Sequence, residues 1–242
     1  MSLIRPSIFS APAVAGVSTR QGGVSPSPLG MNLSYRVGDD AENVTTNRGI
    51  FFGSLGIPLD RLVVPGQVHG DTIRRAEVPG DYPETDGVIC RTPGIYLCVS
   101  VADCVPILLH DPRTGACGAI HAGWRGTVSG ILAKAVRSLV AEYGVRPADL
   151  LAYIGPSASA CCYAVGGDVA RQFLPAHVRD HEGRPFVDLK EANRRQLLDS
   201  GLLPAHIEIS PFCTISDSTL FHSHRRDASK SGRMMGVIGL TA

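Results

Sequence analysis

The stretch that decides the fold reads Ile95-Tyr-Leu-Cys-Val-Ser-Val101, then Val105-Pro-Ile-Leu-Leu109, then Cys117-Gly-Ala-Ile120. Short apolar runs of this length, bounded by turn residues, are typical of buried strands. The segment Asp111-Pro-Arg-Thr-Gly115 between the last two runs is a turn sequence, because Pro suits the second position of a type I turn. We therefore expect a strand followed by a β-hairpin at the centre of the fold.

Helical patterns lie on the C-terminal side of this stretch. Apolar residues recur at helical spacing from about Thr127 to Tyr143, where Gly144 and then Pro147 end the pattern. Asp188 with Glu191 has the spacing of a capping box and predicts a helix that ends at Gly201. Between these two helices, we expect Asp168 to cap a short helix that Pro175 ends.

The two ends of the chain complete the pattern. A helix is expected after Asp39-Asp40, closed by Gly56, and the tail from Arg233 to Leu240 returns to strand. Strands and helices are interleaved with few clean strand-helix-strand units, which favours an α+β fold with mixed sheets. We find no linker composition and assign residues 1–242 to a single domain.

Charge and cysteine content exclude several classes of protein. The 242 residues carry 23 Lys and Arg against 22 Asp and Glu, a net charge of +1 without the basic excess that nucleic-acid or acidic-membrane binding requires. No apolar run is long enough to span a bilayer. Seven cysteines cannot all pair within one chain, and the N-terminus does not resemble a signal peptide. We expect a cytoplasmic protein with no membrane or nucleic-acid partner.

Residues that carry chemistry gather in three segments: Gln67-Val-His-Gly70, Ala102-Asp-Cys-Val-Pro106 and His121-Ala-Gly-Trp-Arg-Gly126. The expected hairpin relates the last two. A two-residue or four-residue loop puts Cys104 and His121 on the same face of the strand pair, whereas a three-residue loop puts them on opposite faces. With His69 they would form a His/Cys/His set, and three ligands with an open position suit a catalytic zinc. Cys104 as a small buried residue is the alternative.

The third segment also suggests an anion site. Gly123-Trp-Arg-Gly126 runs directly into the expected helix, and a helix N-terminus beside an arginine attracts groups such as phosphate. An ordinary strand-to-helix turn with a solvated Arg125 is the alternative.

These three segments resemble the signature blocks of the YfiH-like laccase-domain family. Further motifs match across nearly the whole chain: Ser18–Ser25, Met31–Leu33, Asn47-Arg48, Thr85–Gly87, Ile154–Pro156 and Arg225–Asp227. The resemblance implies a four-layer α/β/β/α arrangement and a zinc ion held by His69, Cys104 and His121, which are then also the catalytic residues. Members are described as polyphenol oxidases and as purine nucleoside phosphorylases with adenosine deaminase activity.

The resemblance thus implies a zinc-dependent enzyme that acts on adenosine and inosine with phosphate, with guanosine and methylthioadenosine left open. Asn32, Arg48 and Arg125 are our candidates for binding substrate or phosphate, and we expect a monomer or small homo-oligomer. The chain departs from the family at Tyr163-Ala-Val-Gly166, where Tyr-Glu-Val-Gly is frequent. The preceding Cys161-Cys162 pair is interpreted as packing residues, with a redox role as the alternative.

Two other functions compete with this one. A copper-dependent polyphenol oxidase would use Cu in place of Zn, but multi-copper chemistry requires many histidines and the chain has only eight, scattered along its length. A hydrolase would use Cys104 as nucleophile and His121 as its base. A tightly bound metal would argue against the hydrolase, because the metal would occupy the thiolate.

Overall fold

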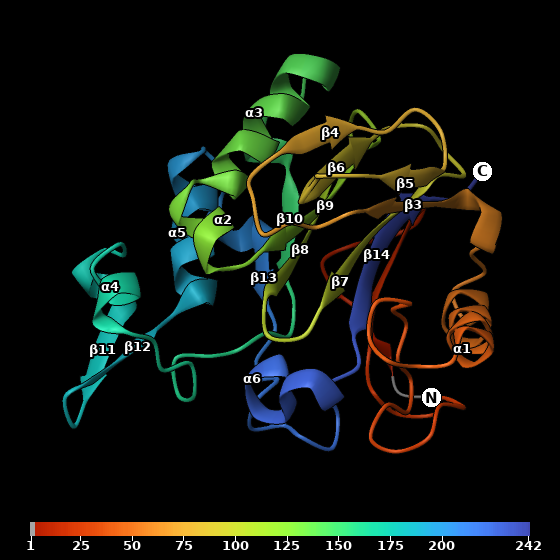
Figure 1. Cartoon of the computed structure of the whole chain (residues 1–242). Coiled ribbons are helices and arrows are strands. Elements are labelled where there is room, and N and C mark those ends of the chain that lie inside the picture. Colours follow the sequence, from red (N-terminus) through yellow and green to blue (C-terminus); the bar gives the residue numbers. More distant parts are fainter. Residues whose placement is uncertain (1–2) are drawn as a thin grey trace.

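Two mixed β-sheets stack face to face in the computed structural model, which describes residues 3–242 (Figure 1). The strands of the first sheet are, in spatial order, β1 (Leu3–Ile4), β2 (Ala13–Ser18), β14 (Met234–Leu240), β7 (Tyr96–Val101), β3 (Leu62–Pro65) and β5 (Gly80–Tyr82). Those of the second are β13 (Ile207–Ile209), β10 (Leu151–Ile154), β8 (Val105–Asp111), β9 (Ala116–Ala122), β6 (Gly87–Cys90) and β4 (Ile73–Arg75). A separate hairpin consists of β11 (Val178–His181) and β12 (Arg184–Val187).

Helices cover the two outer faces of the sheet pair. The helix α1 (Ala41–Gly53) packs on the first sheet, and α3 (Ile131–Tyr143) with α5 (Leu189–Asp199) packs on the second (Figure 1). Shorter helices are α2 (Trp124–Val128), α4 (Gly167–Ala170) and α6 (His224–Asp227), with 3₁₀ turns at Leu59–Arg61, Pro147–Asp149, Pro175–His177, Pro204–His206 and Ala228–Lys230. The expected α+β fold with α/β/β/α layers is confirmed. Within residues 3–242, no helix has the length and apolarity needed to cross a membrane.

Strand alternation explains why the layers form. Along β7, Leu97 and Val99 belong to the apolar cluster between the sheets, whereas Tyr96 and Cys98 belong to the cluster under α1. Successive strand residues point to opposite faces, so a strand that is apolar at every position must be buried on both sides. The continuous apolar runs of the sequence therefore mark the two central layers.

The hairpin forms in one of the two registers that keep Cys104 and His121 on the same face. Val105 lies opposite Ala122 and Asp111 lies opposite Ala116, so the loop holds the four residues Pro112–Gly115. The buried carboxylate of Asp111 accepts hydrogen bonds from Arg113 N and Thr114 Oγ1, at 3.0 and 2.8 Å, and fixes this turn. The predicted helices after Asp40 and from Asp188 are confirmed, as is the C-terminal strand.

Two helix predictions need correction. The pattern from Thr127 to Tyr143 is not one helix but α2 followed by α3, because Gly130 between them adopts a left-handed conformation with φ of 71°. Asp168 does not cap a helix, since it lies inside the single turn of α4 and the capping position is Gly166.

A candidate metal centre in an arginine-lined cavity

Three side chains from three separate segments converge at one end of the sheet pair. The donor atoms of His69, Cys104 and His121 all lie within 4.8 Å of one another. His69 lies in the loop that leaves β3 of the first sheet for β4 of the second, and Cys104 lies in the turn between β7 and β8, which likewise crosses between the sheets. His121 lies near the end of β9. The group therefore forms where the chain passes from one sheet to the other.

The His69 loop is held in an unusual conformation. Gln67 and His69 both have positive φ, 44° and 60°. The Gln67 side chain pairs with the backbone of Ser100 on β7, donating to its carbonyl and accepting from its N–H, each at 2.7 Å. Non-glycine residues adopt positive φ only where surrounding contacts impose it. The conformation of the Gln-Val-His-Gly motif therefore places the His69 side chain beside Cys104 and His121.

Cys104 is positioned by the residue before it. Asp103 has φ of 88°, and its two carboxylate oxygens accept hydrogen bonds from Thr214 Oγ1 at 2.7 Å and from Arg225 N at 2.6 Å. Its carbonyl also accepts from Ala158 N at 2.9 Å. Three partners from distant parts of the chain thus determine the turn that carries the thiol.

Asp86 ties two of the ligand residues together. Its Oδ1 accepts from His121 Nδ1 at 2.8 Å and from His69 N at 3.0 Å, and its Oδ2 accepts from Gly70 N at 2.8 Å. An ionised carboxylate only accepts hydrogen bonds, so His121 carries a proton on Nδ1. Its Nε2 is then the nitrogen that can coordinate a metal ion. A carboxylate that orients a histidine in this way is typical of metal sites.

The charges of the group are strongly coupled. Burial alone would raise the pKa of Cys104, but His121 and His69 lower that pKa to about 6. Burial alone would lower the pKa of His121, but Cys104 and Asp86 raise that pKa to about 9. Each side chain thus favours the charged form of the other, a thiolate on Cys104 beside a protonated His121. A metal ion that displaces the proton of His121 would be coordinated by one thiolate and two imidazoles that are already close together.

The glycines of Gly123-Trp-Arg-Gly126 make room for the group. A Cβ atom on Gly123 would lie 3.2 Å from Cys104 Sγ and 3.3 Å from His69 Cδ2. A Cβ on Gly126 would lie 2.8 Å from the carbonyl oxygen of Gly70. These close approaches let α2 pack directly against the His69 loop, and the donor set itself, sulfur with two nitrogens, suits zinc.

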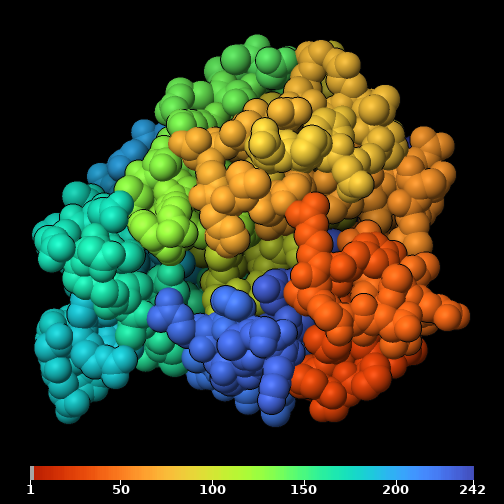
Figure 2. All heavy atoms as spheres, viewed as in Figure 1, coloured from red at the N-terminus to blue at the C-terminus, as the bar shows by residue number. Residues whose placement is uncertain are grey.

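A cavity of about 690 Å³ is lined in part by His69, Cys104 and His121. In the space-filling view, the visible face is hollowed between the orange N-terminal loops, the green segment near residue 125 and the blue C-terminal segment (Figure 2). Five arginines line this cavity: Arg36, Arg48, Arg125, Arg225 and Arg233. The lining carboxylates are Asp81 and Asp103, and Asp103 is already hydrogen-bonded. The cavity is therefore positively charged and suited to an anionic ligand.

Three of these arginines lie over aromatic rings. Arg48 lies 4.4 Å from the ring centroid of Tyr35, Arg125 lies 4.4 Å from that of Trp124, and Arg225 lies 4.9 Å from that of Tyr163. Stacking holds a guanidinium plane in place while leaving N–H groups at its edge free to donate. The cavity is thus lined by aromatic rings and by guanidinium groups that these rings hold in place.

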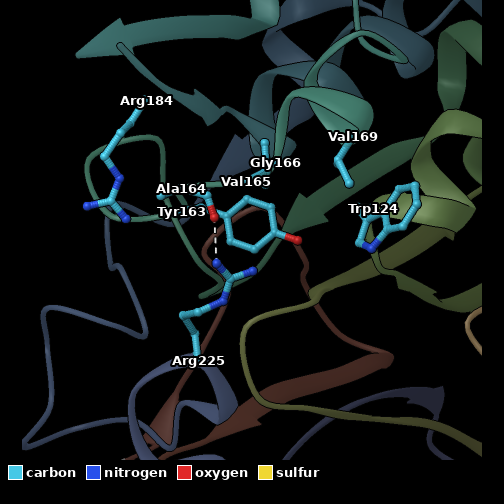
Figure 3. Close-up of a pocket in the computed structure, with 8 residues that line it drawn as sticks. All are labelled: Trp124, Tyr163, Ala164, Val165, Gly166, Val169, Arg184 and Arg225. Carbon is cyan, nitrogen blue, oxygen red and sulfur yellow. Dashed lines mark hydrogen bonds between the residues drawn. The ribbon is translucent and has the colours of Figure 1, made fainter. Parts of the chain in front are cut away.

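A second cavity, of about 310 Å³, adjoins the first. Trp124, Tyr163 and Arg225 line both cavities, and Arg225 donates to the carbonyl of Ala164 (Figure 3). In this view the Tyr163 hydroxyl points toward Trp124. Ala164 lines the smaller cavity at the position where a glutamate is frequent in the resembling family, and no carboxylate lies among the lining residues.

Of the three residues predicted from the sequence to bind substrate or phosphate, two line the large cavity and one does not. Arg48 and Arg125 line the large cavity, although Arg125 lies within the first turn of α2 rather than before a long helix. Asn32 does not line it: its Nδ2 donates to Ser34 O and Asp39, and its Oδ1 accepts from Ser34 N and Arg233 N. The sequence alone assigns no role to Asp86, Tyr163 or Arg225, although all three lie in motifs named above. The Cys161-Cys162 pair is not packed in the core, since Cys161 is exposed and Cys162 half-buried.

Comparisons with known proteins agree with this architecture. A family model described as "Multi-copper polyphenol oxidoreductase laccase" matches residues 14–241. A protein named purine nucleoside phosphorylase YlmD, from Geobacillus stearothermophilus, is 39% identical over 248 residues, covering 95% of this chain and 90% of the relative. A purine nucleoside phosphorylase of Deinococcus radiodurans is 42% identical over 228 residues, covering 92% and 87%. The crystal structure of the Geobacillus YlmD superposes with a TM-score of 0.94 at 36% identity, covering 100% of this chain and 97% of that one.

Proposed function

The chain belongs to the laccase-like polyphenol oxidoreductase family, and on that premise we propose that it is a zinc-dependent purine nucleoside phosphorylase that also deaminates adenosine. One observation carries the proposal: the His69–Cys104–His121 group lies in the wall of a cavity lined by five arginines. Relatives that match most of the chain are named purine nucleoside phosphorylases. The proposed reactions are nucleoside plus phosphate to purine base plus ribose 1-phosphate, and adenosine plus water to inosine plus ammonia.

Phosphate is assigned to the arginines. Arg125 and Arg225 line the same cavity as the His69–Cys104–His121 group, each over an aromatic ring, and Arg48 lines it from α1. Burial lowers the pKa of Arg48 and of Arg233 below the usual arginine value. These partly desolvated cations gain most from a dianion, and they would stabilise negative charge that develops on the leaving base.

The nucleoside is assigned to the apolar faces of the same wall. Trp124 and Tyr163 line both the large and the small cavity, so a planar base lying against them would keep its ribose toward the arginines. Ala164 leaves the smaller cavity without a carboxylate, so base recognition there would rest on stacking and on Arg184 and Arg225. A bound zinc would supply a Lewis acid and activate water for deamination.

Zinc suits the group better than a multi-copper centre. Among the described residues 3–242, His, Cys, Asp and Glu side chains form only two groups of three or more, and one of those consists of cysteines. Only His69 and His121 of the eight histidines belong to either group. A mononuclear copper together with a trinuclear cluster needs far more imidazoles in contact, so oxidase chemistry of that type is not favoured.

A second candidate function rests on the thiolate–imidazolium pair. Cys104 with its lowered pKa and His121 with its raised pKa have the charges of a Cys–His hydrolase. His69 would have no role in such an enzyme. Alkylation distinguishes the two functions: zinc should protect Cys104 from iodoacetamide, whereas a hydrolase nucleophile should stay reactive in the fully active enzyme.

The test is product analysis on the zinc-loaded protein. Inosine with phosphate should yield hypoxanthine and ribose 1-phosphate, and adenosine should yield inosine without phosphate. His69→Ala should lose both activities, whereas His181→Ala, at an exposed histidine on the β11–β12 hairpin, should keep both. Arg125→Ala should raise the phosphate requirement and leave zinc content intact. Phenol oxidation that depends on added copper, with no nucleoside product, would overturn the proposal.

A further inference from the structure

A second group of cysteines lies outside the large cavity. The Sγ atoms of Cys161, Cys162 and Cys213 all lie within 4.8 Å of one another, and those of Cys161 and Cys162 are 3.1 Å apart. The first two cysteines lie in a turn in which Cys162 N and Tyr163 N both donate to Ser159 O, at 2.9 and 3.0 Å. Cys213 comes from a segment some fifty residues later in the chain, joined to this turn by a bridge between Ser157 and Cys213. The fold, not local sequence, brings the three together.

Cys213 is a buried thiol held by a backbone hydrogen bond and placed near a buried cation. Ser159 N donates to Cys213 Sγ at 3.4 Å, and the side chain is buried. The buried ammonium group of Lys190 donates to Phe212 O at 2.6 Å, one residue from Cys213, and offsets negative charge there.

Access and donor type define what such a group could hold. Cys161 is exposed and Cys162 half-buried, so an ion can reach the sulfurs from solvent and displace the thiol protons. Thiolates are soft ligands that select Cu(I), Zn(II) and iron–sulfur clusters over hard cations. A structural zinc takes four ligands, whereas this group offers three sulfurs and neither an imidazole nor a carboxylate.

We propose that Cys161, Cys162 and Cys213 form a second metal site, separate from the His69–Cys104–His121 group, that takes one Cu(I) ion on three sulfurs. Binding releases the thiol protons and involves no electron transfer. The site is independent of the proposed nucleoside chemistry, because none of its ligands lines the large cavity. It would nevertheless clamp the turn that carries Tyr163, a residue that does line that cavity.

The test is an anaerobic titration of the zinc-loaded protein with Cu(I), in competition with a Cu(I) chelator. One equivalent of copper should bind without displacing zinc, and X-ray absorption at the copper edge should report sulfur ligands only. Cys161→Ser, chosen because this exposed thiol is not needed for packing, should weaken copper binding by about tenfold or more, and Cys162→Ser should do the same. Zinc content should remain unchanged in both variants.

Cys90→Ser is the matched control. Cys90 is a buried thiol on β6 outside both groups, and its sulfur accepts from Thr92 N, a role that a serine oxygen can take over. This variant should bind copper as the wild type does. The proposal is overturned if the chelator keeps all of the copper, if copper displaces zinc, or if copper affinity is unchanged in both Cys161→Ser and Cys162→Ser. A preference of the group for a second zinc over Cu(I) would also overturn it.

Discussion

Asp86 connects two of the three residues of the candidate metal centre. It orients the His121 ring through Oδ1 and holds three successive backbone N–H groups of the His69 loop, those of Val68, His69 and Gly70. Burial alone would raise its pKa, but the His121 hydrogen bond and the Gly70 N–H lower it, so the carboxylate stays charged. Two of the three candidate ligands therefore depend on one fully buried side chain.

We predict that Asp86→Asn weakens zinc binding by about 10- to 100-fold, because an amide can reverse the His121 tautomer and cannot accept from every loop N–H group. Competition against a zinc chelator measures the change. Asp71→Asn serves as control, since Asp71 lies beside the same loop but pairs with Lys134. Equal zinc affinity in the Asp86 and Asp71 variants would contradict the assigned role.

Gly123 allows a second test at the residue scale. Its φ of −74° and ψ of 175° suit any residue, so only the missing side chain matters. We predict that Gly123→Ala lowers zinc affinity by about tenfold or more with little loss of folding stability, because the added methyl presses on Cys104 and His69. Gly49→Ala, at an open position inside α1, should instead add up to about 1 kcal/mol of stability with zinc unchanged. Metal analysis and thermal unfolding separate the two effects.

At the scale of elements, sequence reasoning succeeds where a local rule decides the outcome. The face shared by Cys104 and His121 follows from strand alternation and an even loop, and α5 begins where Asp188 accepts from Glu191 N. The role of a residue cannot be predicted from the sequence where it depends on contacts with residues far away in the chain. Nothing near Asp86 in the sequence indicates that it holds the His69 loop, and nothing near Cys161 indicates Cys213. The role of Asn32 as a loop-internal hydrogen-bonding residue likewise depends on Arg233, two hundred positions away.

The break between α2 and α3 is an element-scale feature that periodicity misses, because apolar spacing continues across it. Gly130 has φ of 71°, and its carbonyl accepts from Lys134 N as α3 begins. We predict that Gly130→Ala costs about 1–2 kcal/mol of unfolding free energy, since an alanine Cβ is strained in the left-handed region. Gly130→Asn should lose less, because asparagine tolerates that region. Chemical denaturation measures both, and equal losses would contradict this explanation.

At the scale of the whole molecule, the candidate metal centre joins segments that link the two sheets. The β3–β4 loop and the β7–β8 turn each pass from the first sheet to the second, and β9 belongs to the second. A bound ion would therefore fasten the layers at one end. Apolar packing between the sheets, which includes Leu97, Leu108 and Ile238, holds the rest of the contact.

Removal of the metal should accordingly lower global stability. An ion at about 100 times its dissociation constant stabilises the native state by about 2.7 kcal/mol. For a chain of this size, that corresponds to a fall in Tm of roughly 5–10 °C on chelation. Scanning calorimetry with and without chelator measures it. Cys104→Ala should show no chelator-dependent shift, and a wild-type Tm indifferent to chelation would argue against a metal that bridges the sheets.

The position of β14 has a consequence for synthesis in the cell. This strand, Met234–Leu240, lies between β2 and β7 and pairs with both along almost its full length. On the ribosome, β2 and β7 emerge long before the strand that joins them, so the nascent chain carries two unpaired strand edges until translation has passed residue 240. A premature stop codon that removes β14 would leave those edges open for good, and the product would be a substrate for chaperones and proteases rather than a shortened enzyme.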